Sequence, residues 1–170
     1  MKLFTSTEFN SLQDLFLNQI QDLYDAEQRI TTALPKMIDA AQSSDLKQAF
    51  QSHLAETQQH VTRLEKIFSQ LGADTKRQTC LAMKGIIDEG EEMVNAKGSP
   101  EVKDAALIAA AQLVEHYEMA GYGTARNFAL RLGRQDVANT LQQTLSEEKA
   151  ADEKLTRIAE SQVNVQAAAR

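Results

Sequence analysis

Residues 45–68, DLKQAFQSHLAETQQHVTRLEKIF, carry the pattern that decides the fold. Apolar residues recur in this stretch in steps of three and four, a spacing that places them on one face of an α-helix. They are Leu46, Phe50, Leu64 and Ile67. The same steps also pass through His53, Thr57 and His60 in the middle of the stretch. The sequence therefore predicts a long bundle helix whose buried face carries polar groups halfway along it.

The same pattern returns later in the chain, because residues 45–68 align without a gap with residues 136–159. The matched pairs are Asp45 with Asp136, Gln51 with Gln142, Leu54 with Leu145, Glu56 with Glu147, Leu64 with Leu155, and Ile67 with Ile158. In the same register, Glu27 aligns with Glu118. Self-similarity at a fixed spacing is typical of a repeated structural unit. We therefore expect two copies of a helical hairpin.

Composition agrees with a helical chain of one domain. The chain has 170 residues with only 7 Gly and 2 Pro, too few for the many tight turns of a β-rich fold. The expected helices cover residues 8–41, 45–71, 79–96, 101–132 and 134–161. The predicted fold is all-α, a four-helix bundle built from two repeated hairpins with a short crossover helix at 79–96.

The ends of these elements give further expectations. Residues 1–162 are expected to form the single domain, and the chain is expected to fray from Ser161, leaving 163–170 as a frayed tail. Pro35 lies inside the first predicted helix, where proline removes a backbone hydrogen bond, so a bend or break is expected there.

Charge and cysteine content exclude several classes of protein. Asp and Glu outnumber Lys and Arg by 24 to 18, and the basic residues are interspersed with acids, which argues against nucleic-acid binding. Neither a run of apolar residues long enough to span a membrane nor an export signal is visible, so a cytoplasmic location is expected. Cys80 is the single cysteine, which excludes an internal disulfide and favours a semi-buried small side chain.

Acids occupy the buried stripes of the other long helices, at Glu27, Glu118 and Glu148. A buried carboxylate is costly unless it is paired, protonated or bound to a metal. Carboxylates together with imidazoles suit divalent first-row metals, and four-helix di-iron and di-manganese proteins carry such residues at mid-bundle. The stripes therefore predict a di-metal site.

The internal repeat and the buried stripe agree on some candidate ligands and differ on others. The repeat favours Glu147 where the buried stripe favours Glu148, and both stay candidates. Residues three or four apart share a helix face, which adds His53, Glu56, His60 and Glu115. The full candidate set is Glu27, His53, Glu56, His60, Glu115, Glu118, Glu147 and Glu148. Glu27, Glu56 and Glu118 rank first, His53 with one of Glu147 and Glu148 second, and Glu115 with His60 third.

Neighbouring residues receive structural roles. His116 is expected to point away from the buried stripe, and Tyr24 and Tyr117 are expected to fill the core or to donate hydrogen bonds near the acids. Because carboxylate and neutral imidazole are the ligating forms, metal affinity is expected to fall as pH drops through the ordinary His and Glu pKa values of ~6.5 and ~4.3.

Several motifs also resemble a known family. They are Asp22-Leu-Tyr-Asp-Ala-Glu27, His53-Leu-Ala-Glu-Thr57-x-x-His60-x-x-Arg63-Leu, Thr79-Cys-Leu-Ala-Met-Lys-Gly85, Val114-Glu-His-Tyr-Glu118-x-x-Gly-Tyr-Gly-Thr124 and Leu145-Ser-Glu-Glu-Lys149. Together they resemble the bacterial YciE/YciF-like ferritin-like proteins, the DUF892 family, over nearly the whole chain. The resemblance implies a ferritin-like bundle, a homodimer and a link to stress conditions, and it carries a metal site to Glu27, Glu56, Glu118 and Glu147 or Glu148. It supplies no reaction.

Three functional hypotheses follow. The first is a ferritin-like protein with a di-iron centre, or one of manganese or another divalent metal, that reacts with oxygen or peroxide as an oxidoreductase or a detoxifying enzyme. The second is a non-catalytic, homodimeric helical interaction protein with a degenerate site, motivated by the absence of histidine from residues 134–161. The third is an iron-storage cage, which needs a shell of many subunits. The metal, the oxidant and the physiological partner are not encoded in any motif.

Overall fold

The computed structural model describes residues 8–75 and 78–169, and within them all regular structure is helical. The elements are α1 (Leu12–Ala40), α2 (Ser44–Leu71), α3 (Leu81–Asn95), α4 (Pro100–Arg131), α5 (Gln135–Ile158), a π-helical turn (Ala159–Val163) and α6 (Asn164–Ala168). The predicted all-α fold is confirmed.

Local signals in the sequence explain where the long helices begin and end. Ser11 and Ser43 cap α1 and α2, since their hydroxyls accept hydrogen bonds from backbone N–H groups of the first turn. Gly72 and Gly133 follow α2 and α4 with φ of 62° and 71°, the left-handed conformation that glycine adopts most readily. Pro100 occupies the first turn of α4, where its missing N–H costs nothing.

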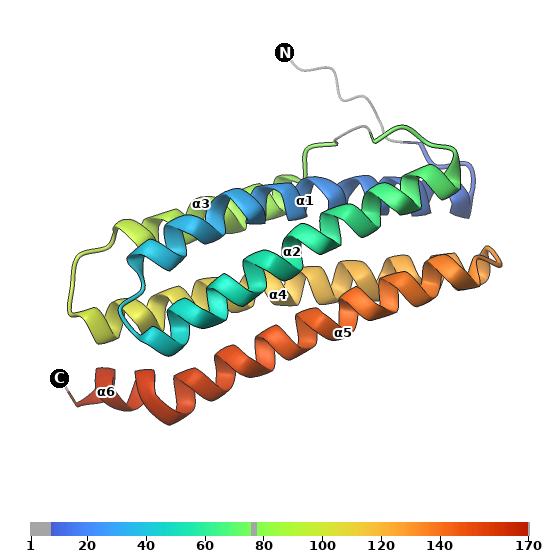
Figure 1. The fold of residues 1–170 in the computed structure, drawn as a ribbon. Coiled ribbons are helices and arrows are strands. Elements are labelled where there is room, and N and C mark those ends of the chain that lie inside the picture. Colours follow the sequence, from blue (N-terminus) through green and yellow to red (C-terminus); the bar gives the residue numbers. More distant parts are fainter. Residues whose placement is uncertain (1–7, 76–77, 170) are drawn as a thin grey trace, which may run out of the picture.

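Two helical hairpins form the bundle (Figure 1). Helix α1 packs against α2 and helix α4 against α5, while α1 also contacts α4 and α2 contacts α5. Helix α3 lies in the connection between the hairpins and packs on α1 and α4. This is the ferritin-like four-helix bundle with a short crossover helix that the sequence predicts.

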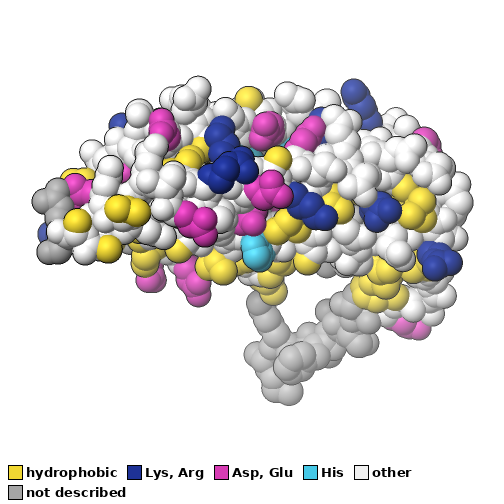
Figure 2. Space-filling model, turned by 90° about the horizontal axis from the view of Figure 1, so that it is seen from below, with side chains coloured by type: hydrophobic (Ala, Val, Ile, Leu, Met, Phe, Trp, Pro, Cys, Tyr) yellow, Lys and Arg dark blue, Asp and Glu magenta, His cyan; other side chains and the backbone are white. Residues whose placement is uncertain are grey.

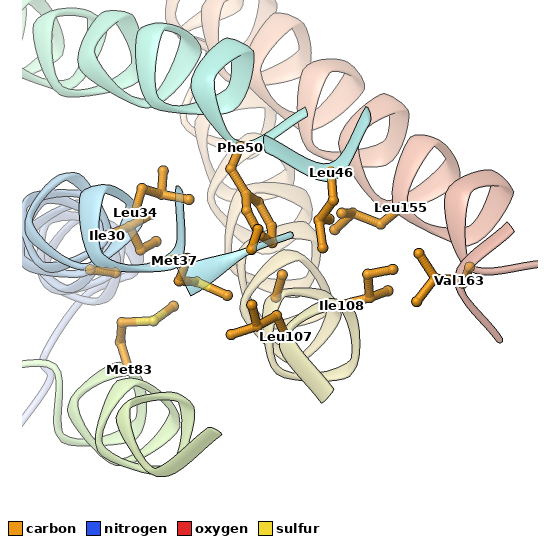
Figure 3. Close-up of a cluster of buried hydrophobic side chains, with 14 of the residues drawn as sticks. Ile30, Leu34, Met37, Leu46, Phe50, Met83, Leu107, Ile108, Leu155 and Val163 are labelled. Atoms are coloured by element: carbon orange, nitrogen blue, oxygen red, sulfur yellow. The ribbon is translucent and has the colours of Figure 1, made fainter. Parts of the chain in front are cut away.

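The core consists of two hydrophobic clusters at opposite ends of the bundle. The first includes Leu34, Phe50, Leu107 and Leu155, and Figure 3 shows its side chains converging from α1, α2, α3, α4 and α5. The second includes Phe16, Leu64, Tyr122 and Leu141. On each of the four long helices, buried polar residues separate the stretches that build the two clusters.

The chain stays helical at two places where a break or fraying was expected. Helix α1 continues through Pro35 without a break. Pro35 is exposed, so the backbone group that loses its partner lies on a side of the helix that water can reach. The segment after Ser161 is helical through Ala168, because Ala159 and Val163 are buried in the first hydrophobic cluster and Gln162 donates a hydrogen bond to Asp45 on α2.

The outer surface carries mixed charge. On the face in Figure 2, acidic and basic side chains are interspersed, and no large field of one sign is visible there. None of the helices in the described part of the chain has an apolar stretch long enough to cross a membrane.

Candidate metal centre

Buried carboxylates and imidazoles meet between the two hydrophobic clusters. One group consists of His53, Glu115, Glu118 and Glu148, and the other of Glu27, His60 and Glu148. Within each group one ligand atom per residue lies within 4.8 Å of all the others. All four long helices contribute, and no residue in either group is more than 6% exposed.

Glu148 is shared by the two groups and turns one oxygen toward each. Its Oε1 lies 2.9 Å from Nδ1 of His60, and its Oε2 lies 4.0 Å from Nε2 of His53. On the first side, Nε2 of His53 is 3.2 Å from Oε1 of Glu115. On the second, Nδ1 of His60 is 3.3 Å from Oε1 of Glu27. Glu148 therefore has the position of a carboxylate that could bridge two ions.

Most of the possible metal-ligand atoms are buried without ordinary hydrogen bonds. Among the described residues, neither oxygen of Glu118 nor of Glu148 has a hydrogen-bond partner, and the same holds for both ring nitrogens of His53 and for Nδ1 of His60. The short N···O distances between the histidines and the acids therefore lack the angles of hydrogen bonds. Buried polar atoms are normally satisfied, so unpaired donors converging on a common centre fit metal ligands. Four carboxylates with neutral imidazoles would also balance the charge of two divalent cations.

In the metal-free protein, burial and neighbouring charges raise the pKa values of five side chains at the centre. Burial raises the pKa of Glu27, and it raises the pKa values of Glu115 and Glu118 well above their usual range. Burial alone would lower the pKa of His53, but the Glu115 carboxylate outweighs it and raises that pKa to about 9. His60 behaves alike, since the adjacent carboxylates of Glu148 and Glu27 outweigh burial and raise its pKa to about 11. Protonated forms of these five side chains are therefore favoured when no metal is bound.

Two candidate acids, Glu56 and Glu147, lie outside both groups. Oε2 of Glu147 is 2.8 Å from Nε2 of His60, the ring nitrogen that faces away from Glu148, and Arg63 binds both oxygens of Glu147. Glu56, whose side chain is 43% exposed, similarly has Oε2 at 3.7 Å from Nδ1 of His53. Each histidine thus faces the centre with one nitrogen and a peripheral acid with the other. A carboxylate behind a histidine is how proteins orient metal-binding imidazoles.

Sequence reasoning missed Tyr122, which is 1% exposed and donates a hydrogen bond to Oε1 of Glu27. Its position four residues after Glu118 on α4, hence on the same helix face, was the available signal. Burial raises the pKa of Tyr122 well above its ordinary value, so its hydroxyl keeps its proton and can donate. Tyr122 therefore holds Glu27 in place.

The other tyrosines lie away from the buried acids. Tyr24 donates to Oε1 of Glu65, whereas the Tyr117 hydroxyl contacts Asp22 and the Sγ of Cys80. Cys80 is a free, buried cysteine at the start of α3. His116 points outward as expected: its side chain is 65% exposed, and its Nε2 is 3.4 Å from Asp152.

Comparison with known proteins settles the family. Residues 11–168 match the model of a domain of unknown function, DUF892. The chain belongs to this family. It is 44% identical over 158 residues to protein YciF of Escherichia coli (strain K12), which covers 92% of this chain and 95% of the relative.

Two solved structures are similar to the present fold. The crystal structure of the E. coli stress protein YciF matches with a TM-score of 0.88 at 43% identity, over 92% of this chain and 99% of that one. The structure of YcfI from Rhodopseudomonas palustris matches with a TM-score of 0.86 at 44% identity, over 90% and 98% of the respective chains. The family and its helical bundle are thereby established for this chain.

Proposed function

We propose that this protein binds two redox-active divalent metal ions at mid-bundle, iron first and manganese as an alternative, and reacts with oxygen or peroxide. The observation that carries the proposal is Glu148, a fully buried carboxylate shared by two groups of converging ligands. When bound, the metal pair would supply the electrons for reducing the oxidant. His53, Glu115 and Glu118 would hold one ion, and Glu27 with His60 the other.

The surrounding side chains would prepare these ligands. Glu147, held by Arg63, accepts the outer N–H of His60 and leaves Nδ1 facing the centre. Glu56 has the same relation to His53 at a longer distance. Tyr122 fixes one oxygen of Glu27 and leaves the other free for a metal. Preorganised ligands of this kind reduce the reorganisation needed on binding.

Metal analysis tests the proposal directly. We expect the protein purified in air to contain metal, and Fe(II) or Mn(II) titration of the metal-free protein to approach two ions per chain. Glu118→Gln removes a ligand and should reduce the stoichiometry, whereas Glu153→Gln alters an acid on α5 that is 72% exposed and should leave it unchanged. Less than about one metal per two chains under saturating conditions would contradict the proposal, because a preformed carboxylate site fills readily.

One observation favours a second candidate function, a non-catalytic interaction protein with a degenerate site. The group of Glu27, His60 and Glu148 offers three protein ligands, and α5 supplies no histidine. Under this alternative, the double variant Glu27→Ala with Glu118→Ala should be more stable than the wild type with or without metal, because it removes unpaired buried acids. Under the metal hypothesis, metal should stabilise the wild type alone, by linkage.

We further propose a stress-associated, cytoplasmic role as a homodimer. Similarity to a stress protein of E. coli supports the first part, and a single cysteine without a disulfide partner supports a reducing compartment. Size-exclusion chromatography with light scattering separates the assemblies: a dimer is expected, and a shell of many subunits would instead favour iron storage.

A further inference from the structure

A narrow apolar crevice leads from the surface to the candidate metal centre. It runs beneath α3, between that helix, α1 and α4, and its inner end is formed by His53 and Glu115. Its walls are mainly aliphatic or small: they include Ile30, Leu34, Met37, Ile87, Gly90 and Ala110. Ile30, Leu34 and Met37 are labelled on α1 in Figure 3, opposite Met83 of α3. The crevice thus reaches two of the proposed ligands without crossing a polar wall.

The size and lining of the crevice restrict what it can take. Its cavity volume is about 40 Å³, room for a molecule of a few atoms and too little for an organic substrate. Apolar cavities of protein interiors stay dry and accept xenon and similar uncharged molecules. Lys36 and Glu91, paired with one another, flank the crevice on its outer side with side chains 53% and 43% exposed. A hydrated ion would lose its water shell inside without compensation.

A second pocket reaches the same two ligands from another side. It lies between α2 and α5, has a volume of about 220 Å³, and carries the charged side chains Glu56, Lys154 and Arg157. Ions and water can be solvated there by charged groups. The two approaches to His53 and Glu115 therefore differ in polarity, which suits ligands of different chemistry.

We propose that the crevice beneath α3 binds dioxygen and delivers it to the metal centre, separately from the polar pocket. This role rests on the proposed function. Dioxygen is small, uncharged and apolar, as the volume and the walls require. Peroxide, which needs hydrogen-bond partners, would approach through the polar pocket instead.

Two glycines of α3 allow the crevice to be filled in one variant and left open in a matched control variant. A Cβ at Gly90 would lie 3.9 Å from the Cβ of Ala110 on the opposite wall, so Gly90→Leu should fill the crevice. A Cβ at Gly85 meets nothing within 4 Å, so Gly85→Leu makes the same chemical change on the same helix without entering the crevice. Ala110→Val narrows the crevice from the other side, and Gly90→Ala is a gentler substitution where folding is impaired.

Xenon binding to the metal-free protein is the first readout, by crystallography under xenon pressure or by xenon NMR. We expect xenon beneath α3 in the wild type and in Gly85→Leu, and its loss in Gly90→Leu and Ala110→Val. Absence of xenon from the wild-type crevice, or its persistence in both filled variants, would overturn the proposal.

The second readout is oxidation of the Fe(II)-loaded protein by dissolved dioxygen. We expect Gly90→Leu to slow oxidation with unchanged iron stoichiometry, while oxidation by added hydrogen peroxide keeps its rate. Equal dioxygen rates in Gly90→Leu and Gly85→Leu would refute delivery through the crevice but leave the metal centre intact. Failure of the wild type to take up metal would refute the proposed function, and the xenon result would still report on the crevice.

Discussion

Metal binding should release protons from the centre, and the number released per ion can be measured. In the metal-free protein, burial raises the pKa values of Glu115 and Glu118 well above the usual range, which favours their protonated forms. His53 and His60 are charged because neighbouring carboxylates raise their pKa values to about 9 and about 11. Metals bind the deprotonated forms. Because the Glu115 carboxylate that raises the pKa of His53 shares one proton with it, the four groups should release about three protons as two ions bind, or between about one and two per ion. Each ion's apparent association constant should then rise about 10- to 100-fold per pH unit near neutrality.

Calorimetric titration measures this release. Mn(II) is added without oxygen in buffers of different ionisation enthalpy, and the slope of the observed heat against that enthalpy gives the proton count. Glu118→Gln should lower the count by about one, while the exposed Glu153→Gln should not change it. Release of fewer than about one proton per ion by the wild type would refute the assignment of protonated acids and imidazoles at the centre. Metal affinity should therefore begin to fall at a pH above the ordinary His and Glu pKa values of ~6.5 and ~4.3, because the pKa values of the ligands are raised.

Four other outcomes are expected. Glu148→Gln should lose both ions because the residue belongs to both ligand groups, whereas Glu147→Gln should keep the stoichiometry and weaken affinity about 10- to 100-fold, as measured by metal titration. With chelator present, thermal unfolding should give a lower Tm at pH 8 than at pH 6, because the raised pKa values of Glu115 and Glu118 mean that the folded state binds more protons than the unfolded chain and loses stability as pH rises. Asp104→Ala should cost about 1–3 kcal/mol in urea unfolding, since the buried carboxylate accepts hydrogen bonds from two backbone N–H groups of the α1–α2 turn.

Helical spacing predicted the long helices and the depth of the acids within the bundle. Glu27, Glu118 and Glu148 lie on the predicted buried stripes and are 0% exposed. The choice between Glu148 and Glu147 depended on two arguments that select neighbouring residues, which lie about 100° apart around a helix. The structure places Glu148 in the centre and Glu147 on Arg63, as the buried stripe indicates.

The repeat identified a pair of acids that lie next to the histidines and outside the ligand groups, a position that the sequence alone did not indicate. It pairs Glu56 with Glu147, and both lie at the edge of the centre, each behind a histidine. Both acids thus lie next to a histidine and outside the two ligand groups, and Glu147 is also bound by Arg63. Glu115 ranked low because the narrow stripe drawn for α4 omitted it, yet α4 contacts α1, α3 and α5 and therefore buries a wider face. That these residues bind metal stays a prediction.

The unequal division of ligands between the two hairpins has a consequence for how a duplicated chain acquires a centre. The first hairpin contributes one acid and two imidazoles, and the second contributes three acids. Two copies of the first would leave a pair of divalent cations with excess positive charge, and two copies of the second would surround them with excess negative charge. Only the mixed pair reaches electrical neutrality inside an apolar bundle, where uncompensated charge is costly. For the proposed pair of divalent cations, differences between the two hairpins at positions such as Thr57 and Glu148 are therefore what allows a neutral centre.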